Sequence, residues 1–242
     1  MRTALISDLH GNHVSLKAVL DDIDRTGIDE VICLGDVATL GPRPSEVISE
    51  LGERGCRCIL GNHDAFMLDD QLIRSYTEVP IVVDAVDWCR DQLSADEIAF
   101  LSRFELKIPM QLGKNTSALL FHGSPRSHME DLLATTPPDE LDEALAGSQA
   151  TVLAGGHTHI QMLRQHRGML LVNPGSVGMP FRQYASGNAP QILPHAEYAV
   201  IEADDDNVSV TLRRVSVDKH RLRAEAADSD NPICRSLEQQ YT

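Results

Sequence analysis

Five short apolar runs of this chain each end at a side chain that can bind a metal ion. The runs have the length of β-strands, and glycine usually flanks the polar residues that follow them. These segments are Asp8-Leu9-His10, Gly35-Asp36, Gly61-Asn62-His63-Asp64, His122-Gly123 and Gly155-Gly156-His157-Thr158-His159. In an open α/β sheet the carboxyl ends of the strands lie along one edge, where ligands bind. We therefore expect these side chains to converge, although much of the chain separates the first from the last.

The N-terminal part of the chain alternates between strand and helix patterns. Residues 3–6, 30–34 and 56–60 are apolar runs typical of strands. A helical stripe of apolar residues from Leu16 to Ile23 separates the first two runs, and Pro44 opens a second helix before the third. This βαβαβ order predicts a parallel sheet with right-handed helical crossovers.

The rest of the chain departs from this alternation. Residues 64–105 are predicted to be helical, with Ser94 and Glu97 spaced as a capping box, and we interpret them as a helical insertion over one end of the sheet. Further strands are predicted at 106–111, 117–121, 151–154, 162–166, 169–172, 196–202 and 208–217. Because no repeat or linker divides the chain, we expect residues 1–242 to form one domain.

Composition excludes several classes of protein. The 36 acidic and 21 basic residues give a net charge of −15, which argues against long nucleic acids and anionic membrane surfaces as partners. No apolar run is long enough to span a membrane, and no secretory signal is expected. The five cysteines contain no Cys-x-x-Cys pair, so we interpret them as buried thiols in a reducing compartment and predict a cytoplasmic protein.

The donors at the strand ends fit borderline metal ions. They combine imidazole, carboxylate and one carboxamide without a thiolate, which suits Mn²⁺, Fe or Zn²⁺ better than Ca²⁺ or a soft metal. They also outnumber the ligands of one ion. Two divalent ions about 3.5–4 Å apart, bridged by a carboxylate, would use them all. We expect Mn²⁺, with Fe, Zn²⁺ and Ni²⁺ as alternatives.

Taken in order, these segments resemble the motif set of the calcineurin-like metallophosphoesterases. Four stretches, 7–12, 41–47, 122–126 and 173–178, resemble a small bacterial and archaeal phosphodiesterase-like branch, and the resemblance covers about residues 1–217. It implies an α/β fold, α+β in some schemes. The expected architecture is a four-layer sandwich of two packed mixed β-sheets flanked by helices.

The resemblance also implies a role for each residue of the site. One ion would be held by Asp8, His10 and His159, the other by Asn62, His122 and His157, and Asp36 would bridge them. A hydroxide between the ions would attack phosphorus in line. His63, with its ring oriented by Asp64, would position the phosphate or protonate the leaving oxygen.

Contacts to the substrate are less well defined. Asn12 is a candidate phosphate ligand or a helix cap, and Arg126 is a candidate phosphate ligand or a surface residue. Arg182 stands one position later than the arginine that this branch often carries after the proline at 180. The Asp-Arg-Gly of protein phosphatases and diadenosine tetraphosphate hydrolases is replaced by Ala38-Thr39-Leu40-Gly41. Phosphoproteins and dinucleoside polyphosphates are therefore less expected as substrates than small phosphodiesters.

These observations leave three functions open. The first is a metal-dependent hydrolase of small phosphodiesters. The second is a phosphomonoesterase acting on nucleotides or phosphoproteins with the same ions. The third is a metal-dependent scaffold without catalysis. Selectivity between the two hydrolases is expected to reside in residues 64–105 and 180–195, and the sequence leaves the oligomeric state open.

Overall fold

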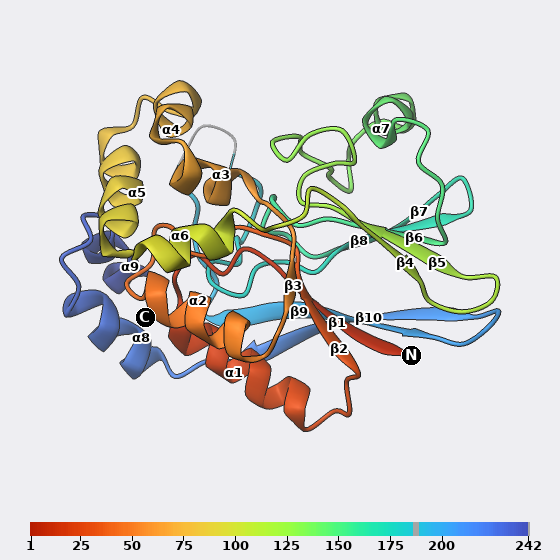
Figure 1. The fold of residues 1–242 in the computed structure, drawn as a ribbon, viewed down its shortest axis with the longest axis horizontal. Coiled ribbons are helices and arrows are strands. Elements are labelled where there is room, and N and C mark those ends of the chain that lie inside the picture. The colour runs from red at the N-terminus through yellow and green to blue at the C-terminus, as the bar shows by residue number, and fades with distance from the viewer. Residues whose placement is uncertain (186–188, 242) are drawn as a thin grey trace.

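The computed structural model describes residues 1–185 and 189–241, and it contains two packed five-stranded sheets (Figure 1). The first has the order β10-β9-β1-β2-β3, formed by β1 (Arg2–Ile6), β2 (Glu30–Cys33), β3 (Arg57–Cys58), β9 (His195–Ala203) and β10 (Val208–Ser216). The second has the order β4-β5-β6-β8-β7, formed by β4 (Ile108–Gln111), β5 (Ser117–Leu120), β6 (Val152–Ala154), β7 (Met162–His166) and β8 (Met169–Asn173). The predicted segment 180–195 lies partly outside the described residues, at 186–188.

The predicted βαβαβ unit is confirmed. Helices α1 (His13–Asp24) and α2 (Pro44–Glu53) connect β1, β2 and β3, which pair in parallel, whereas β9 is antiparallel to β1. The side chain of Asn12 accepts a hydrogen bond from the backbone N–H of Ser15 and so caps α1, and Pro44 occupies the first turn of α2. In the second sheet β5, β6 and β8 are parallel while β4 and β7 are antiparallel edges, so that both sheets are mixed.

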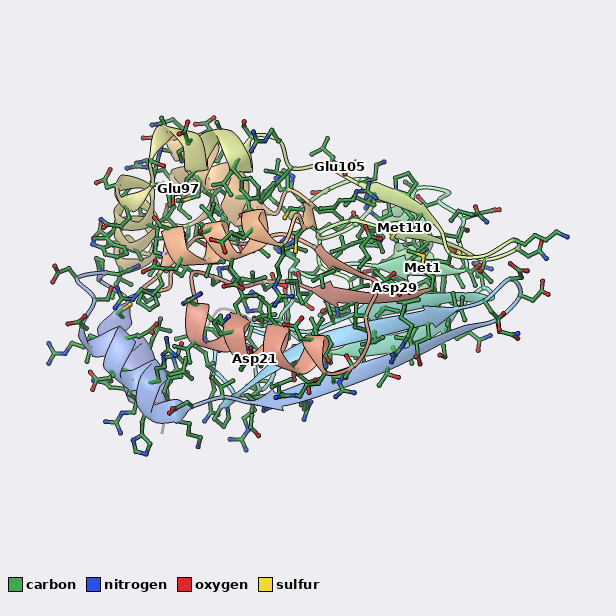
Figure 2. All side chains as sticks on the ribbon, turned by 60° about the horizontal axis from the view of Figure 1, so that its bottom comes forward. Met1, Asp21, Asp29, Glu97, Glu105 and Met110 are labelled. Atoms are coloured by element: carbon green, nitrogen blue, oxygen red, sulfur yellow. The ribbon has the colours of Figure 1, made fainter. Side chains whose placement is uncertain are left out.

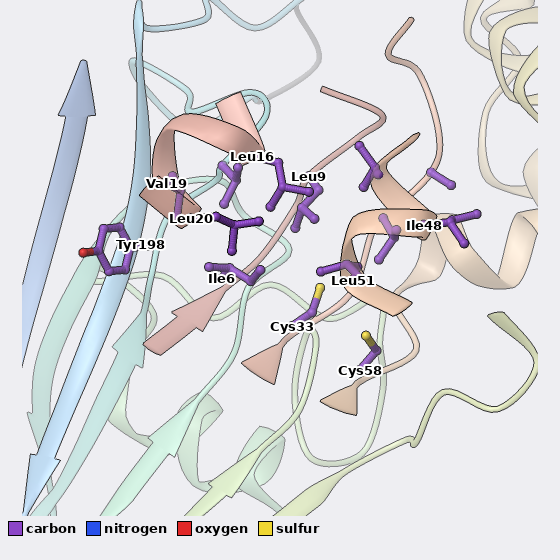
Figure 3. Packing of buried hydrophobic residues seen from close by; sticks show 14 of the residues in the cluster. Ile6, Leu9, Leu16, Val19, Leu20, Cys33, Ile48, Leu51, Cys58 and Tyr198 are labelled. Carbon is purple, nitrogen blue, oxygen red and sulfur yellow. The ribbon is translucent and has the colours of Figure 1, made fainter. Parts of the chain in front are cut away.

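Alternation along the strands divides the core between two layers. Leu5 faces the second sheet and packs in a cluster with Leu120 and Val152, whereas Ala4 and Ile6 belong to the cluster beneath the helices. Figure 3 shows that cluster, in which Ile6 lies close to Leu20 of α1. The two predicted packed sheets with helices outside them are therefore confirmed.

The remaining helices surround this sandwich. They are α3 (Asn62–Leu68), α4 (Asp70–Tyr76), α5 (Pro80–Gln92), α6 (Ala95–Leu101), α7 (Pro138–Leu145), α8 (Lys219–Ala227) and α9 (Cys234–Gln240). The capping box of Ser94 and Glu97 begins α6, as predicted. Helix α7 covers the second sheet with Leu141 and Leu145, which pack against Leu153. Figure 1 places α3 to α6 and the C-terminal pair α8 and α9 at the same end of the sandwich.

Several element boundaries differ from the predicted ones, among them those of the third and fourth strands. The third strand is short, and the helix after it begins at Asn62 because the Asp64 carboxylate accepts a hydrogen bond from the backbone N–H of Gly61. The fourth strand begins at Ile108, two residues late, and the preceding Leu106 is exposed.

The surface carries charged side chains, and the cysteines are free thiols, as predicted from the composition. Charged side chains such as Asp21, Asp29 and Glu105 extend outward from the ribbon (Figure 2). The five cysteines are free thiols, four of them buried, and Cys56 is half-buried. Within the described residues, every helix is too short or too polar to cross a membrane.

Candidate metal centre

The candidate ligands come together where strand ends of both sheets meet. We expected one edge of one sheet, and this was wrong because β1, β2 and β3 belong to the first sheet while β5 and β6 belong to the second. Backbone hydrogen bonds join the segments. The N–H of Asp8 donates to the carbonyl of Gly35 at 2.9 Å, and the N–H of Gly156 donates to that of His122 at 2.7 Å.

Six of the seven predicted ligands form two overlapping groups of buried donors. One group is Asp8, His10, Asp36 and His159, and the other is Asp36, His122 and His157. Within each group the ligand atoms lie within 4.8 Å of one another, and Asp36 belongs to both. The seventh, Asn62, places its side-chain oxygen 3.1 Å from His122 Nε2.

The first group has unmet lone pairs that a cation would satisfy. His159 Nδ1 donates to the carbonyl of Met179 at 2.7 Å, so its Nε2 carries a lone pair when the ring is neutral. That Nε2 lies 3.0 Å from His10 Nε2 and 3.4 Å from Asp8 Oδ1. Asp8 Oδ1 is buried without a hydrogen-bond donor among the described residues. Electron pairs from three side chains therefore converge, an arrangement that is costly without a bound cation.

The second group has the same organisation. His122 Nδ1 donates to the carbonyl of Leu34 at 2.7 Å, which directs Nε2 toward the centre. This Nε2 lies 3.4 Å from Asp36 Oδ2, and the same oxygen lies 3.8 Å from His10 Nε2 in the first group. Asp36 Oδ2 thus stands between the two groups, where a bridging carboxylate is required.

Burial sets the protonation of the imidazoles. It lowers the pKa of His10, His159 and His157, the last to about 3, so these rings are neutral at pH 7 and can donate a lone pair to a metal. Burial acts in the same direction on His122, but the Asp36 and Asp8 carboxylates outweigh it and raise its pKa to about 10. In the metal-free protein a proton on His122 takes the place of part of the metal charge.

The backbone of the centre is held in an unusual conformation. Eight non-glycine residues of the described chain have positive φ, and five of them are candidate ligands. Those five are Asp8 (53°), His10 (45°), Asp36 (58°), His157 (69°) and His159 (58°). Because each such residue costs roughly 1–3 kcal/mol, their concentration here marks a site that the surrounding structure enforces.

Gly61 leaves room for the shared carboxylate. A methyl group at this position would overlap Asp36 Oδ1. We expect Gly61→Ala to weaken Mn²⁺ binding by about 10- to 100-fold, the range seen when a group that supports a metal ligand is displaced. Isothermal titration calorimetry measures the effect. The matched control is Gly52→Ala in α2, whose nearest neighbour would be 3.9 Å away; equal affinities of the two variants would contradict the prediction.

The two predicted catalytic residues have different surroundings. His63 is buried next to the first group, with its ring centroid 4.9 Å from that of His10. Asp64 was expected to orient this ring, but its carboxylate instead accepts hydrogen bonds from the backbone of Asp36, Val37 and Gly61 at 2.8–2.9 Å. Asp64 therefore holds the loop that carries Asp36, which corrects its predicted role.

Thr39 makes the contact that we assigned to Asp64. Its hydroxyl lies 3.0 Å from His63 Nδ1 and 3.1 Å from His10 Nδ1, and it is fully buried. Thr39 thus connects a candidate ligand to the candidate catalytic histidine. No local pattern in the sequence indicates this role; the one available indication is its position three residues after Asp36.

The three predicted substrate contacts have structural partners. Asn12 caps α1 and donates from Nδ2 to the carbonyl of Gly178 at 2.9 Å. Arg126 is exposed and forms an ion pair with Glu130, while the Arg182 guanidinium donates to the side chain of Gln191 at 3.1 Å. None of the three is among the described residues that line the cavity at the centre. The structure instead brings Asp131 to the centre, with its Oδ1 3.5 Å from His157 Nε2.

Comparison with known proteins places this centre in a family. The family model of the calcineurin-like phosphoesterase superfamily domain matches residues 1–206. The chain is 29% identical over 192 residues to an uncharacterized protein of Methanocaldococcus jannaschii, covering 73% of this chain and 76% of that one. It superposes on the crystal structure of a metallophosphoesterase from Sphaerobacter thermophilus with a TM-score of 0.76 at 26% identity, covering 100% and 98% of the two chains.

A shorter match concerns an enzyme whose name states its activity. The symmetrical bis(5'-nucleosyl)-tetraphosphatase of Cronobacter sakazakii is 31% identical over 112 residues. The match covers 40% of this chain and 40% of that enzyme's own length.

Proposed function

This chain belongs to the calcineurin-like phosphoesterase superfamily, and we propose that it is a dinuclear-metal hydrolase of small phosphodiesters. The observation that carries the proposal is the position of Asp36, which belongs to both groups of buried donors. We assign Asp8, His10 and His159 to one ion, Asn62, His122 and His157 to the other, and Asp36 to both. Two divalent ions held there would generate a nucleophile from water at neutral pH and neutralise charge on the phosphoryl oxygens.

The hydrogen bonds around Thr39 support a role for His63 as a hydrogen-bond donor to the substrate. In our assignment His10 binds metal through Nε2, so its Nδ1 carries the proton and donates to Thr39 Oγ1. The Thr39 hydroxyl is then free to donate to His63 Nδ1. Burial lowers the pKa of His63, which keeps the ring neutral and leaves its single proton on Nε2. We propose that this Nε2–H donates a hydrogen bond to a phosphoryl or leaving-group oxygen and so positions it.

Charge around the centre supports a diester rather than a monoester substrate. A monoester carries up to two negative charges and a diester one. No lysine or arginine lines the cavity at the centre among the described residues, and Arg126 and Arg182 are engaged elsewhere. With only the ions to neutralise the substrate, the monoanion fits better. The same feature disfavours polyphosphates, including those named for the relative from Cronobacter sakazakii.

The proposal is tested by hydrolysis of bis(p-nitrophenyl) phosphate by metal-stripped protein with and without added Mn²⁺. Turnover that returns with Mn²⁺ is the expected result, and Fe²⁺, Zn²⁺ and Ni²⁺ are compared under the same conditions. Tight binding of the metals without hydrolysis of any phosphoester would instead identify a scaffold. Comparable or faster hydrolysis of p-nitrophenyl phosphate would overturn the diester preference.

Replacement of Thr39 tests the role of His63. We expect Thr39→Val, which removes the hydroxyl at nearly constant shape, to lower kcat for bis(p-nitrophenyl) phosphate by about 10- to 100-fold with little change in KM. Thr39→Ser keeps the hydroxyl and should stay close to the wild-type rate. Steady-state kinetics at saturating Mn²⁺ provide the measurement. A valine variant as active as the serine variant would contradict the hydrogen-bond chain.

A further inference from the structure

A cavity of about 240 Å³ opens directly from the candidate metal centre. Its inner end is formed by candidate ligands and by His63, and its outer part by side chains that have no role in the chemistry proposed so far. An apolar cavity of about 150 Å³ holds one benzene, and sites for drug-sized ligands begin near 300 Å³. The cavity is therefore large enough for one ring-sized group and smaller than the usual site for a drug-sized ligand.

Two aromatic rings extend the sides of the centre into this cavity. The Phe181 ring stacks on His159 with centroids 4.2 Å apart and an angle of 26° between the planes. The Tyr76 ring stands edge-on to the His63 ring, with 6.5 Å between the ring centroids, and its centroid lies 5.3 Å from that of the Phe66 ring. A group attached to a phosphorus atom at the centre would lie next to both rings, and flat rings make favourable stacked and edge-on contacts of this kind.

The wall farther from the metal ligands comes from the C-terminal helix α9. Ile233, Ser236, Leu237 and Gln240 all line the cavity, and they lie beyond residues 1–206, which the family model matches. The helix is firmly placed, because Leu237 is buried in a cluster with Ile192 and Gln240 Oε1 accepts a hydrogen bond from the backbone N–H of Ile192 at 2.8 Å. This wall is therefore contributed by a part of the chain that the family model does not match.

Among the residues that the structure describes, the outer part of the cavity offers no charged partner. Apart from Tyr76, Ser236 and Gln240, its side chains are aliphatic or aromatic: Leu40, Val82, Met179, Phe181, Ala189, Pro190, Ile192, Ile233 and Leu237. A second phosphate or a carboxylate placed here would lose its hydration without gaining a cation, which is costly.

We propose that this cavity binds one of the two organic groups of the phosphodiester, and that this group is a single uncharged ring, aryl or nucleobase-sized. The inference rests on the proposed function, because it assumes that the phosphoryl group sits on the metal ions. To the proposed function it adds the class of the substrate. The substrate carries one phosphorus atom, and its ring is recognised by Phe181, Tyr76 and α9.

Binding of phosphonates to the Mn²⁺-loaded protein tests this inference without any turnover. Isothermal titration calorimetry compares methylphosphonate, phenylphosphonate and 4-carboxyphenylphosphonate, which share the metal-binding group. We expect phenylphosphonate to bind at least about tenfold tighter than methylphosphonate, because its ring enters the apolar cavity. We expect the added carboxylate to remove most of that gain. Equal binding of the methyl and phenyl compounds would overturn the inference, and so would tighter binding of the carboxylate.

A charge placed on the α9 wall locates the ring. Ser236 is exposed and lines the cavity, so Ser236→Arg should leave the fold intact and supply a cation there. We expect this variant to prefer 4-carboxyphenylphosphonate over phenylphosphonate by several-fold, with methylphosphonate unchanged. Gln239→Arg is the matched control, since Gln239 is exposed on the same helix and does not line the cavity. An unchanged order in Ser236→Arg would refute the placement. Phosphonate selectivity in a protein that hydrolyses no diester would count against the proposed function alone.

Discussion

Replacing Asp36 by asparagine is expected to lower kcat/KM for bis(p-nitrophenyl) phosphate by about three orders of magnitude and to reduce the bound metal below two ions per chain. Asp36 Oδ2 lies 3.4 Å from His122 Nε2 and 3.8 Å from His10 Nε2, so one oxygen faces both groups of ligands. An asparagine offers one neutral carbonyl oxygen and an NH₂ group that cannot bind a cation. The variant loses the bridge and a negative charge at once.

The structure allows this effect to be separated from a loss of folding. Asp36 Oδ1 accepts a hydrogen bond from the backbone N–H of His63 at 2.8 Å, and an asparagine oxygen can keep this contact. Circular dichroism should therefore be unchanged while metal analysis and kinetics change together. Asp205→Asn, at an exposed turn, makes the same chemical change far from the centre. Wild-type turnover by Asp36→Asn with the expected control would rule out the dinuclear mechanism.

The sequence predicted the candidate ligands because strand geometry fixes where they lie. Asp8 follows β1 and Asp36 follows β2, and in parallel strands these positions meet at one end whatever the loops do. The same reasoning assumed one sheet. It did not show that His122 and His157 come from a second sheet packed against the first, because short apolar runs do not specify which strands pair.

Residues whose role depends on tertiary contacts are not marked by any pattern in the sequence. Thr39 joins two imidazoles, and Met179 orients His159, but both lie in loops where neither periodicity nor a motif marks them. The positive φ of five candidate ligands could not be predicted from the sequence either, because aspartate and histidine adopt it here only where the two sheets hold them. The ion pair of Arg126 with Glu130, by contrast, joins residues four apart and was accessible to sequence reasoning.

The lining of the cavity could not be predicted from the sequence either. Its outer part is assembled from α4, α5, the segment around Phe181 and α9, which are far apart in the chain. Each contributes one or two apolar side chains that, taken alone, are ordinary core residues. In the function that we propose, substrate selectivity depends on packing between distant segments, whereas the candidate metal ligands lie in short sequence motifs. This difference explains why the sequence indicated the reaction more sharply than the substrate.

Removing the metal ions is expected to lower the melting temperature by about 10–20 °C. An ion that binds only the folded protein stabilises it by about 2.7 kcal/mol when present at 100 times its Kd, so two sites contribute about 5 kcal/mol. For a chain of this size each kcal/mol shifts the melting temperature by about 2–4 °C. Thermal unfolding of the chelator-treated protein, followed by stepwise return of Mn²⁺, measures the effect.

The physical reason lies in what the ions would hold together. Without them the centre keeps a buried carboxylate oxygen of Asp8 that has no donor among the described residues, and the Nε2 atoms of His10 and His159 face each other at 3.0 Å. Burial raises the pKa of Asp8, the direction expected of a carboxylate that lacks a stabilising cation. Ca²⁺, which prefers oxygen ligands, should restore much less stability than Mn²⁺ at this imidazole-rich centre. Asp36→Asn should lose most of the Mn²⁺-dependent rise, whereas an equal rise in that variant and in the wild type would show that the stabilising ions bind elsewhere.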